Sequence, residues 1–352
     1  MPEWDPDPLL RRLGLGVLED AGDGASRAGR NDNRVGVTST GQPVFVKRLD
    51  PAQPDAVARF RRLVRFERHA PVSGPLTAPP CLGWDEDGLI VVFAWLRDAR
   101  SGSDLAKEEA FDDDLAHLAG RAVGALHALP LPLPLTMEDQ PLLPPLDFFE
   151  ALPLTYHTQA SGASLEAWGL LQNDAELIAG LRELRREEAA AEHRPAHCDL
   201  RLDQFLRQGD ALHLCDWEEF RPAADPARDI GGFVGEWLHR AVLDIPSQDP
   251  AIAGPAPQLS HRDVVERGVR ELERLRTRNV AFWKGYREES GAVDPGLPAR
   301  ATAFAGWHLV DRMFAAAEQR PKLTALDRAA AGIGRTAVLR PARFAATLGL
   351  ED

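Results

Sequence analysis

Carboxylate and amide side chains recur at close spacing between residues 197 and 218. A His-Cys-Asp tripeptide ends at Asp199, Gln204 follows five residues later, and Asp216 comes after a short apolar stretch. In phosphoryl transfer, an enzyme supplies a carboxylate near the attacking hydroxyl, oxygens that hold Mg²⁺ on the phosphates and a cation for the nucleotide. An aspartate on a loop, a later amide and a second aspartate on a strand suit that chemistry.

The same residues carry a resemblance to a known family. They resemble the kinase catalytic loop H-x-D-x-x-x-x-N and the metal-binding Asp of the next strand, which read HGDL and hhDWE in aminoglycoside and choline kinase relatives. The resemblance implies that Asp199 is the catalytic base and that Gln204 and Asp216 are metal ligands. Gln204 keeps the amide of the family's Asn but adds a methylene. Arg201 lies where protein kinases carry a Lys, and a cation there would stabilise charge on the transferred phosphoryl group.

A second motif follows that strand. The run Asp225-Pro226-Ala227-Arg228-Asp229 resembles the G-D-P-x-x-D motif of the family, with Ala224 in the place of the Gly. There the second acid, Asp229 in this chain, supports the catalytic loop from a helix N-terminus. An H-x-D tripeptide alone would be weak evidence, because a lone Asp in a turn is usually a cap. The combination favours an aminoglycoside phosphotransferase-like, protein-kinase-like chain.

The first hundred residues contain candidates for nucleotide binding. The run Val44-Phe45-Val46-Lys47 resembles the V-A-I-K strand, whose Lys reaches the α- and β-phosphates of ATP. The expected partner of Lys47 is a Glu on the next helix, and Glu67 is the best placed. A Lys that ends a strand is otherwise an ordinary solvated edge residue.

Two backbone segments complete the expected nucleotide site. The loop 22–33, with Ser26 and Gly29, occupies the place of the phosphate-covering loop, where its N–H groups could cradle phosphate. A plain surface loop is the alternative. The segment 93–96 corresponds to the hinge, so backbone groups of Ala94 and Leu96 are expected to meet the adenine edge.

The elements that must position these residues fall into two regions. Alternating β-branched and aromatic residues predict four strands in the first hundred residues: Arg34–Ser39, Val44–Lys47, Cys81–Trp84 and Leu89–Trp95. Helical spacing predicts a first helix and then a mostly helical remainder: Pro54–His69, Phe111–Leu129, Ala175–Ala191, Gly231–Leu243, His261–Ser290, Pro298–Gln319 and Thr324–Ala337. We expect an α+β, bilobal protein-kinase-like fold, with a β-rich N-lobe over 1–96 and a helical C-lobe over 97–352.

Bulk properties restrict the function and the location. The 352 residues carry a formal charge of −13, which argues against nucleic-acid binding because that needs a basic face. The three cysteines form no C-x-x-C pair, which favours a reducing cytoplasm. The first residues are acidic and proline-containing, unlike a secretory signal. No apolar run approaches the roughly 20 residues of a membrane span. We expect a cytoplasmic, ATP- and Mg²⁺-dependent kinase with no membrane partner.

The sequence leaves three hypotheses for the function, two of which differ in the phosphate acceptor. The stretches HCDLRLDQFL, DWEEFRPAADPARD and GGFVGEWLHRAV resemble the stand-alone kinase subunits of class V lanthipeptide and thioamitide clusters. That resemblance implies a precursor peptide as substrate, phosphorylated on Ser or Thr, and a partner lyase subunit that eliminates the phosphate. The second reading is a small-molecule hydroxyl substrate, such as a cationic antibiotic. The third is a catalytically dead, kinase-shaped binding subunit. In the kinase readings, the acceptor would be held by 131–168 and the segments after Gly231.

Overall fold

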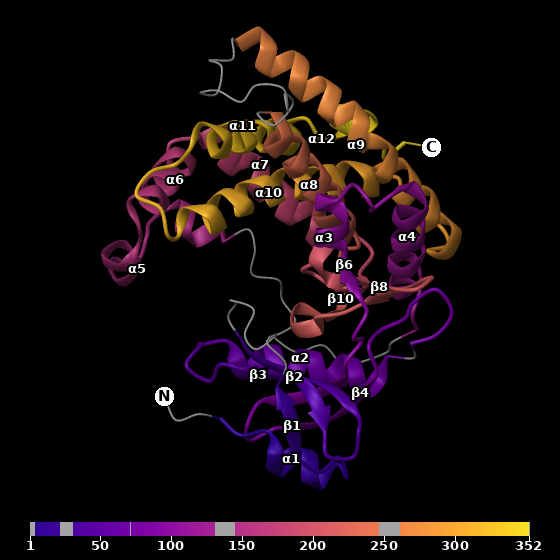
Figure 1. The fold of residues 1–352 in the computed structure, drawn as a ribbon. Coiled ribbons are helices and arrows are strands. Elements are labelled where there is room, and N and C mark those ends of the chain that lie inside the picture. Colours follow the sequence, from indigo (N-terminus) through magenta and orange to yellow (C-terminus); the bar gives the residue numbers. More distant parts are fainter. Residues whose placement is uncertain (1–3, 22–30, 71, 131–144, 246–260, 352) are drawn as a thin grey trace, which may run out of the picture. The chain divides into compact units, whose positions relative to one another are not determined.

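The computed structural model describes residues 4–21, 31–70, 72–130, 145–245 and 261–351, and the chain divides into two compact units (Figure 1). Unit 1 comprises Met1–Ala110, Leu129–Pro134 and Asp203–Arg221. Unit 2 comprises Phe111–Ala128, Leu135–Leu202 and Pro222–Asp352. The expected division had a single boundary after residue 96, whereas the chain crosses between the units several times.

A five-stranded antiparallel sheet is the centre of unit 1. Its strand order is β1-β2-β3-β5-β4, and its bounds are β1 Leu18–Ala21, β2 Asn31–Thr38, β3 Pro43–Leu49, β4 Cys81–Asp85 and β5 Ile90–Ala94. The turn between β2 and β3 needs Gly41 at φ +83°, a conformation that favours glycine. The four strands predicted from alternation are all present, and β1 adds an edge.

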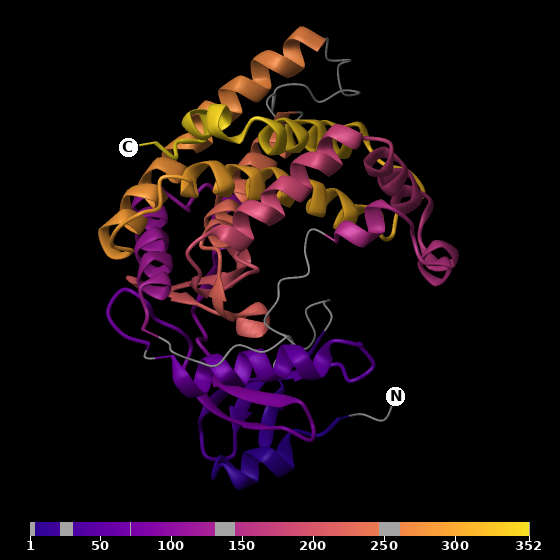
Figure 2. The same ribbon diagram turned by 180° about the vertical axis from the view of Figure 1, so that it is seen from behind.

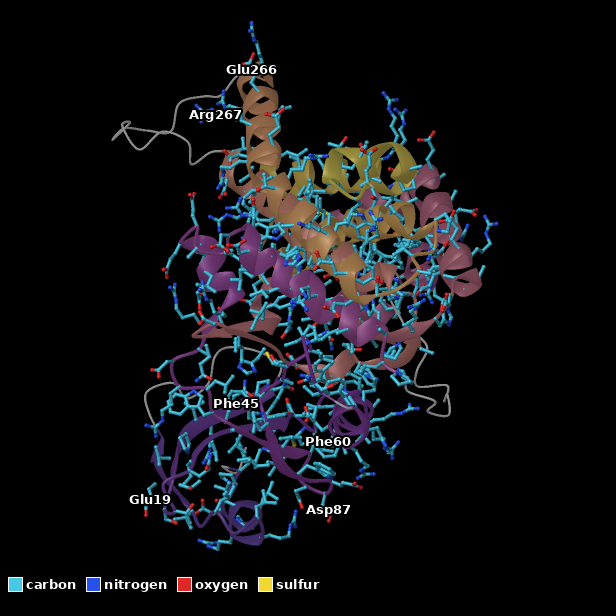
Figure 3. The ribbon with its side chains drawn as sticks, turned by 90° about the vertical axis from the view of Figure 1, so that its right-hand side faces the viewer. Glu19, Phe45, Phe60, Asp87, Glu266 and Arg267 are labelled. Carbon is cyan, nitrogen blue, oxygen red and sulfur yellow. The ribbon has the colours of Figure 1, made fainter. Side chains whose placement is uncertain are left out.

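The two faces of β3 have different environments. Successive side chains of a strand point to opposite faces. Val44 and Val46 are fully buried and pack in a cluster with Leu9 and Leu10 of helix α1 (Asp7–Arg12). The other face carries Phe45, which is labelled in Figure 3, and then Lys47. Alternation in β3 therefore gives Val44 and Val46 to the core and leaves Phe45 and Lys47 on the opposite face.

A segment from late in the sequence completes unit 1. The hairpin of β8 (Phe205–Gln208) and β9 (Ala211–Leu214) pairs with β6 (Arg100–Ser101), which precedes helix α3 (Gly102–Lys107). Thr77 joins this hairpin: its hydroxyl donates to the Leu212 carbonyl, and its own carbonyl accepts the Leu214 amide (2.7 and 2.8 Å). These contacts place the residues after β9 inside unit 1.

Helix α2 (Ala56–His69) packs against the turn that follows β9. The ring of Phe66 stacks on Trp217 in the 3₁₀ turn η4 (Trp217–Glu219), with ring centroids 3.5 Å apart. The helix begins two residues later than expected, after the turn that contains Asp55. Because of this packing, one side of α2 faces the acidic residues of η4.

Unit 2 is built mainly from helices. Their bounds are α4 Asp113–His127, α5 Leu154–Gln159, α6 Gly162–Gln172, α7 Ala175–Ala190, α8 Ala227–Asp244, α9 His261–Glu289, α10 Leu297–Ala317, α11 Ala325–Leu339 and α12 Pro341–Leu348. Short elements of the unit are η2 Leu146–Phe149 and the pair β7 Arg194–Ala196 and β10 Arg221–Ala224, the last of which begins at the unit boundary. Helix α10 packs against α6, α7, α8, α11 and α12 and is therefore the central helix of the unit (Figure 2).

Helix α8 begins four residues before the Gly231 start predicted from the sequence. The glycine pair Gly231-Gly232 lowers helix propensity, but tertiary packing explains its place inside the helix. A Cβ on Gly232 would lie 2.5 Å from the carbonyl oxygen of Leu200, and one on Gly231 would lie 2.6 Å from that of Ala301 in α10. The missing side chains let the loop and α10 approach the helix backbone.

Most of the other predicted helices are present in unit 2. Helices α4, α7, α9, α10 and α11 are present within a few residues of their expected bounds, whereas α1, α3, α5, α6 and α12 were not predicted. Residues 145–158 contain the short helical piece η2 and most of α5, and Pro153 between them prevents one regular helix. In the part of the chain that the structure covers, no helix is both long and apolar enough to cross a membrane.

Candidate active-site residues

Lys47 forms the centre of a charged cluster in unit 1. Its side chain is 9% exposed, and its Nζ lies 2.5 Å from Asp216 Oδ1 and also contacts Glu218 Oε1. Burial alone would lower the pKa of the ammonium, but these two carboxylates hold the pKa of Lys47 above its usual value. Lys47 is therefore a fixed cation beside two carboxylates.

Glu218 is bonded at every side-chain oxygen. Oε1 accepts from Asn31 Nδ2 (2.6 Å) and contacts Lys47, while Oε2 accepts from Arg59 Nη1 (2.8 Å). Its backbone carbonyl accepts from Arg62 Nε at 2.7 Å. A buried carboxylate is stable when cations and hydrogen bonds surround it in this way. Two cations of α2 thus hold η4 in place.

Asp216 has a different environment from Glu218. It lies at φ +72° and ψ +59°, a left-handed conformation that is uncommon for a non-glycine residue. Its side chain is 31% exposed, whereas that of Glu218 is 9% exposed. The exposed carboxylate of Asp216 is therefore the better placed of the two to meet a ligand.

Gln204 lies in unit 1 with Asp216, as the expected metal set requires. The backbone carbonyl of Gln204 accepts a hydrogen bond from the backbone amide of Cys215 (2.9 Å), which ties Gln204 to the residue before Asp216. The residue is 3% exposed, and its Nε2 atom is buried with no hydrogen-bond partner. The unsatisfied Nε2 is a hydrogen-bond donor, so the missing partner at that end is an acceptor such as a phosphate oxygen, whereas a metal ion would be bound through Oε1.

The donor set around Asp216 fits a nucleotide-bound Mg²⁺. Mg²⁺ is usually held by one or two carboxylates together with phosphate oxygens and waters, rather than by a complete protein cage. Among the described residues, no group of three or more His, Cys, Asp or Glu side chains is arranged to hold a metal ion. Asp216, with Gln204 nearby in the chain, would hold the ion together with the nucleotide.

The catalytic-loop residues lie in unit 2 and are held by Asp229. Both carboxylate oxygens of this buried residue accept backbone amides: Oδ2 from His197 and Oδ1 from Cys198, each at 2.7 Å. Burial raises the pKa of Asp229, but the bond from His127 and the adjacent histidines bring that pKa below its usual value. Asp229 is therefore an anion, and it holds the backbone of the two residues before Asp199 in place.

His127, at the C-terminal end of α4, completes this network. Its Nε2 lies 3.0 Å from Asp229 Oδ2 and its Nδ1 lies 3.1 Å from the hydroxyl of Tyr286 in α9. The side chains of His127 and Asp229 are fully buried. Three helices, α4, α8 and α9, thus meet behind the loop through polar contacts.

Asp199 presents its carboxylate at the surface of unit 2. Its side chain is 42% exposed and lies 3.4 Å from Arg201 Nη2, while its amide points at His197 Nδ1 (3.4 Å). The preceding Cys198 has φ +65°. The loop therefore turns sharply at Cys198 and carries an exposed carboxylate with a guanidinium beside it.

The prediction that Glu67 pairs with Lys47 is wrong. Glu67 lies near the end of α2, and its Oε1 atom is buried without a hydrogen-bond partner. Burial raises the pKa of Glu67 to about 7, and its charge acts on Cys81, whose pKa burial and Glu67 raise to about 12. The helix turns Glu67 toward the start of β4, so Lys47 takes its carboxylates from the segment after β9.

Ala94 and Leu96 each use one backbone group in a hydrogen bond within unit 1. The amide of Ala94 donates to Pro80 and the carbonyl of Leu96 accepts from Ala99 (2.8 and 3.1 Å). If these residues meet an adenine, the carbonyl of Ala94 and the amide of Leu96 must do so. Ser26 and Gly29 lie outside the described residues.

Three functional candidates were not identified from the sequence. Glu218 belongs to the D-W-E motif, so the sequence shows an acidic residue there but does not show that it pairs with Lys47. Arg59 is one of several arginines in α2, and only packing separates it from the others. His127 has no metal-ligand spacing to other residues. The only sequence feature that indicates it is its place as a polar residue at the end of an apolar helix face.

Within each unit, the arrangement has a definite chemical capacity. Unit 1 presents a lysine, a partly exposed aspartate and an unsatisfied amide, which together suit a phosphate chain with a divalent cation. Unit 2 presents an exposed aspartate on a loop fixed from behind, which suits proton acceptance from a hydroxyl.

Comparisons with known proteins identify the fold. Neither a protein-family model nor a curated protein sequence matches this chain. A choline/ethanolamine kinase family protein from Mesorhizobium loti is similar in structure at 16% identity, with a TM-score of 0.54 over 98% of this chain and 96% of that chain. Amicoumacin kinase hAmiN, solved with AMP-PNP, Ca²⁺ and Ami, is similar at 13% identity and TM-score 0.54 over 96% and 93%. Choline kinase LicA from Streptococcus pneumoniae is similar at 11% identity and TM-score 0.51 over 94% and 97%.

At these identities, the likeness shows the fold. The chain has the α+β, protein-kinase-like fold of these enzymes, with a small antiparallel sheet in unit 1 and a larger helical unit 2.

Proposed function

We propose that this chain is an ATP- and Mg²⁺-dependent kinase that transfers the γ-phosphoryl group of ATP to a hydroxyl group. The observation that carries the proposal is the fixed loop before Asp199. A carboxylate buried in a helix accepts two consecutive loop amides (2.7 Å each) and leaves the next aspartate exposed. Rigid positioning of one base is what phosphoryl transfer needs most from a protein.

Each residue has a role in this reaction. Asp199 orients the acceptor hydroxyl and takes its proton as the oxygen bonds to the γ-phosphorus. The bond between that phosphorus and the β–γ bridging oxygen breaks, and ADP leaves with the electron pair. Arg201 stabilises the negative charge of the group in transfer. Lys47 binds the α- and β-phosphates, and Asp216 with Gln204 would hold Mg²⁺, which neutralises charge on the phosphate oxygens when bound.

For the acceptor, we infer a Ser or Thr hydroxyl of a ribosomal precursor peptide. The support is the resemblance of 197–206 and 216–229 to kinase subunits of class V lanthipeptide and thioamitide biosynthesis. In that chemistry, a separate lyase removes the phosphate to form a dehydroamino acid. We propose such a lyase as a partner and the cytoplasm as the compartment.

A small-molecule hydroxyl is the second candidate acceptor. The solved structures with this fold include kinases named for choline, ethanolamine and amicoumacin. The formal charge of −13 agrees with a cationic compound. Mass spectrometry after incubation with Mg-ATP separates the candidates: phosphate on a Ser/Thr-rich precursor peptide supports the first, and phosphate on choline-like amines or antibiotics supports the second.

Two substitutions test the catalytic assignment itself. Asp199→Asn should reduce phosphoryl transfer by at least about a thousandfold, because the base is lost, while the Kd for ATP stays within about twofold. Asp216→Asn should raise the Kd for Mg-ATP by about tenfold or more. ATP turnover unchanged in both variants would contradict the assignment and favour a kinase-shaped binding subunit without catalytic activity.

A further inference from the structure

The charged cluster of unit 1 differs from the expected kinase arrangement in the source of the carboxylate that holds Lys47. We infer that Glu218 is the residue that positions Lys47, and that Arg59 of α2 holds Glu218 in place. Helix α2 therefore contributes a cation to the cluster, where a carboxylate was expected. This inference rests on the proposed nucleotide site and adds to it the residue that keeps the phosphate-binding lysine in place.

The contacts of Glu218 carry the first step. Its two side-chain oxygens contact Lys47, Asn31 and Arg59. Its backbone carbonyl accepts a hydrogen bond from Arg62 Nε (2.7 Å). These partners come from β2, β3 and α2. Because three elements converge on one carboxylate, Glu218 cannot leave Lys47 without breaking contacts to each of them.

Arg59 supplies the second step. Its side chain is 3% exposed, and its Nη1 donates to Glu218 Oε2 at 2.8 Å, while its Nε lies 3.4 Å from Asp55. A buried guanidinium strongly favours a carboxylate partner, since an unpaired charge in that place is costly. The α2 residue that faces the cluster is thus basic, and the one acid of α2, Glu67, is turned away toward Cys81.

Exposure distinguishes the two carboxylates that contact Lys47. Asp216 is 31% exposed and Glu218 is 9% exposed. If Asp216 bound a phosphate-bound cation, Lys47 would lose one of its two counter-charges. Glu218, enclosed by its other partners, stays bonded to Lys47 and keeps the ammonium in place for the phosphates.

A double-mutant cycle on nucleotide affinity tests this role. The Kd of ATP is measured by calorimetry, with and without Mg²⁺, for wild type, Glu218→Gln, Lys47→Gln and the double variant. We expect Glu218→Gln to raise the Kd by about tenfold, which is the size expected for the loss of one charge-assisted bond. Because Glu218 acts through Lys47, the double variant should match Lys47→Gln alone within about twofold.

Glu67→Gln is the matched control, since it makes the same chemical change in the other candidate carboxylate of unit 1. Its Kd for ATP should stay within about twofold of wild type, and it should add independently to Lys47→Gln. Additive effects of Glu218→Gln and Lys47→Gln would overturn the inference. So would a loss of affinity in Glu67→Gln that disappears in the Lys47→Gln background.

A nucleotide-free readout keeps the inference separate from the proposed function. Acetylation of Lys47 by an amine-reactive reagent is followed by mass spectrometry in wild type, in Glu218→Gln and in the more conservative Glu218→Asp. Loss of the counter-charge should speed the reaction several-fold in the Gln variant and less in the Asp variant. Equal rates in all three proteins would refute the pairing. If wild type binds no ATP, the proposed function fails, and the acetylation rates still decide whether Glu218 holds Lys47.

Discussion

Cys198 sets the direction of the loop that carries Asp199. Its φ of +65° places it in the left-handed region, and its amide donates to Asp229 at 2.7 Å. A side chain with a Cβ costs roughly 1–2 kcal/mol in that region, a cost that glycine avoids. The family pattern HGDL has a glycine at this position. The loop therefore keeps its shape through the Asp229 contacts in spite of its cysteine.

Replacing this cysteine should stabilise the protein. Cys198→Gly is expected to raise the free energy of unfolding by roughly 0.5–1 kcal/mol, because relief of the left-handed strain exceeds the added entropy of glycine in the unfolded chain. Denaturant unfolding of the two proteins measures the change.

Cys215→Gly serves as the control. Cys215 is also a partly buried free cysteine, but its φ is not positive. Its replacement should lower the stability, since glycine brings only an entropic cost there. If both variants lose stability equally, the left-handed angle of Cys198 stores no strain that glycine relieves.

Spacing in the sequence predicted single site residues but not the partners that the structure gives them. The H-x-D and D-W-E motifs predicted Asp199 and Asp216 as site residues, although Asp216 lies just before the 3₁₀ turn η4 and not on the expected strand. The partner of Lys47 was assigned to Glu67 because it is the one acid on the following helix. The observed partner Glu218 lies far along the chain, and only tertiary packing of η4 on α2 brings it to Lys47.

Among the secondary-structure elements, the junction of α2 and β4 makes folding depend on pH. Burial raises the pKa of Glu67 from 4.5 to about 7, so the folded protein favours the protonated acid. The unfolded chain loses that proton at lower pH. Stability is then full below about pH 4.5, falls as the pH rises toward 7, and is constant above it.

Glu67→Gln should remove this pH dependence. Above pH 7 the variant is expected to be more stable than wild type by up to about 3 kcal/mol, and the difference should vanish near pH 4.5. Denaturant unfolding from pH 4.5 to 8 measures the difference. Glu86→Gln, at an exposed position, is the control and should keep the wild-type profile. A constant difference across this range would contradict the assignment.

Close packing of α8 gives a second prediction for an element. Gly232→Ala would place a Cβ 2.5 Å from the Leu200 carbonyl oxygen, so the loop or the helix must move. We expect a loss of about 1–3 kcal/mol of stability and a lower kcat, because Leu200 follows Asp199. Thermal unfolding and initial rates measure the two effects.

Gly169→Ala is the matched control for that substitution. Gly169 lies within α6 and has no atom within 4 Å of the added Cβ. Alanine there should raise the stability by about 0.5–1 kcal/mol through helix propensity alone. A loss of stability in both variants would show that helix packing at Gly232 is not special.

The same glycines show why element boundaries were harder to predict than element types. Helical spacing predicted a helix that begins at Gly231. The observed start at Ala227 depends on contacts with Leu200 and with α10, which local patterns do not contain. Strands β2 to β5, in contrast, follow from alternation and turn residues alone.

For the whole molecule, ligand binding should be visible as a shift of Tm. ATP at about 100 times its Kd stabilises a folded protein by about 2.7 kcal/mol if it binds only the native state. We expect Mg-ATP to raise Tm by several degrees, and EDTA to remove most of that shift. The Asp199→Asn variant should keep the shift and Asp216→Asn should lose most of it. An equal shift with and without Mg²⁺ would contradict a metal role.

The division of the chain into units was the part of the fold least accessible from sequence. A change from strands to helices near residue 100 predicted one boundary. The structure assigns Asp203–Arg221 to unit 1 through the contacts of Thr77, Phe66 and Lys47. These contacts join residues that are far apart in the sequence, and they produce no periodic pattern of residue types from which they could be predicted.

The late arrival of Asp203–Arg221 has a consequence for synthesis on the ribosome. When the chain has emerged to residue 110, Lys47, Arg59 and Arg62 have no Glu218 or Glu219 to pair with, and Phe66 has no Trp217 to stack on. About a hundred further residues must follow, which takes on the order of 5–20 s at ordinary elongation rates. We therefore expect the nascent unit 1 to expose these cations and Phe66 throughout that interval, and to be a client of chaperones until its second segment emerges.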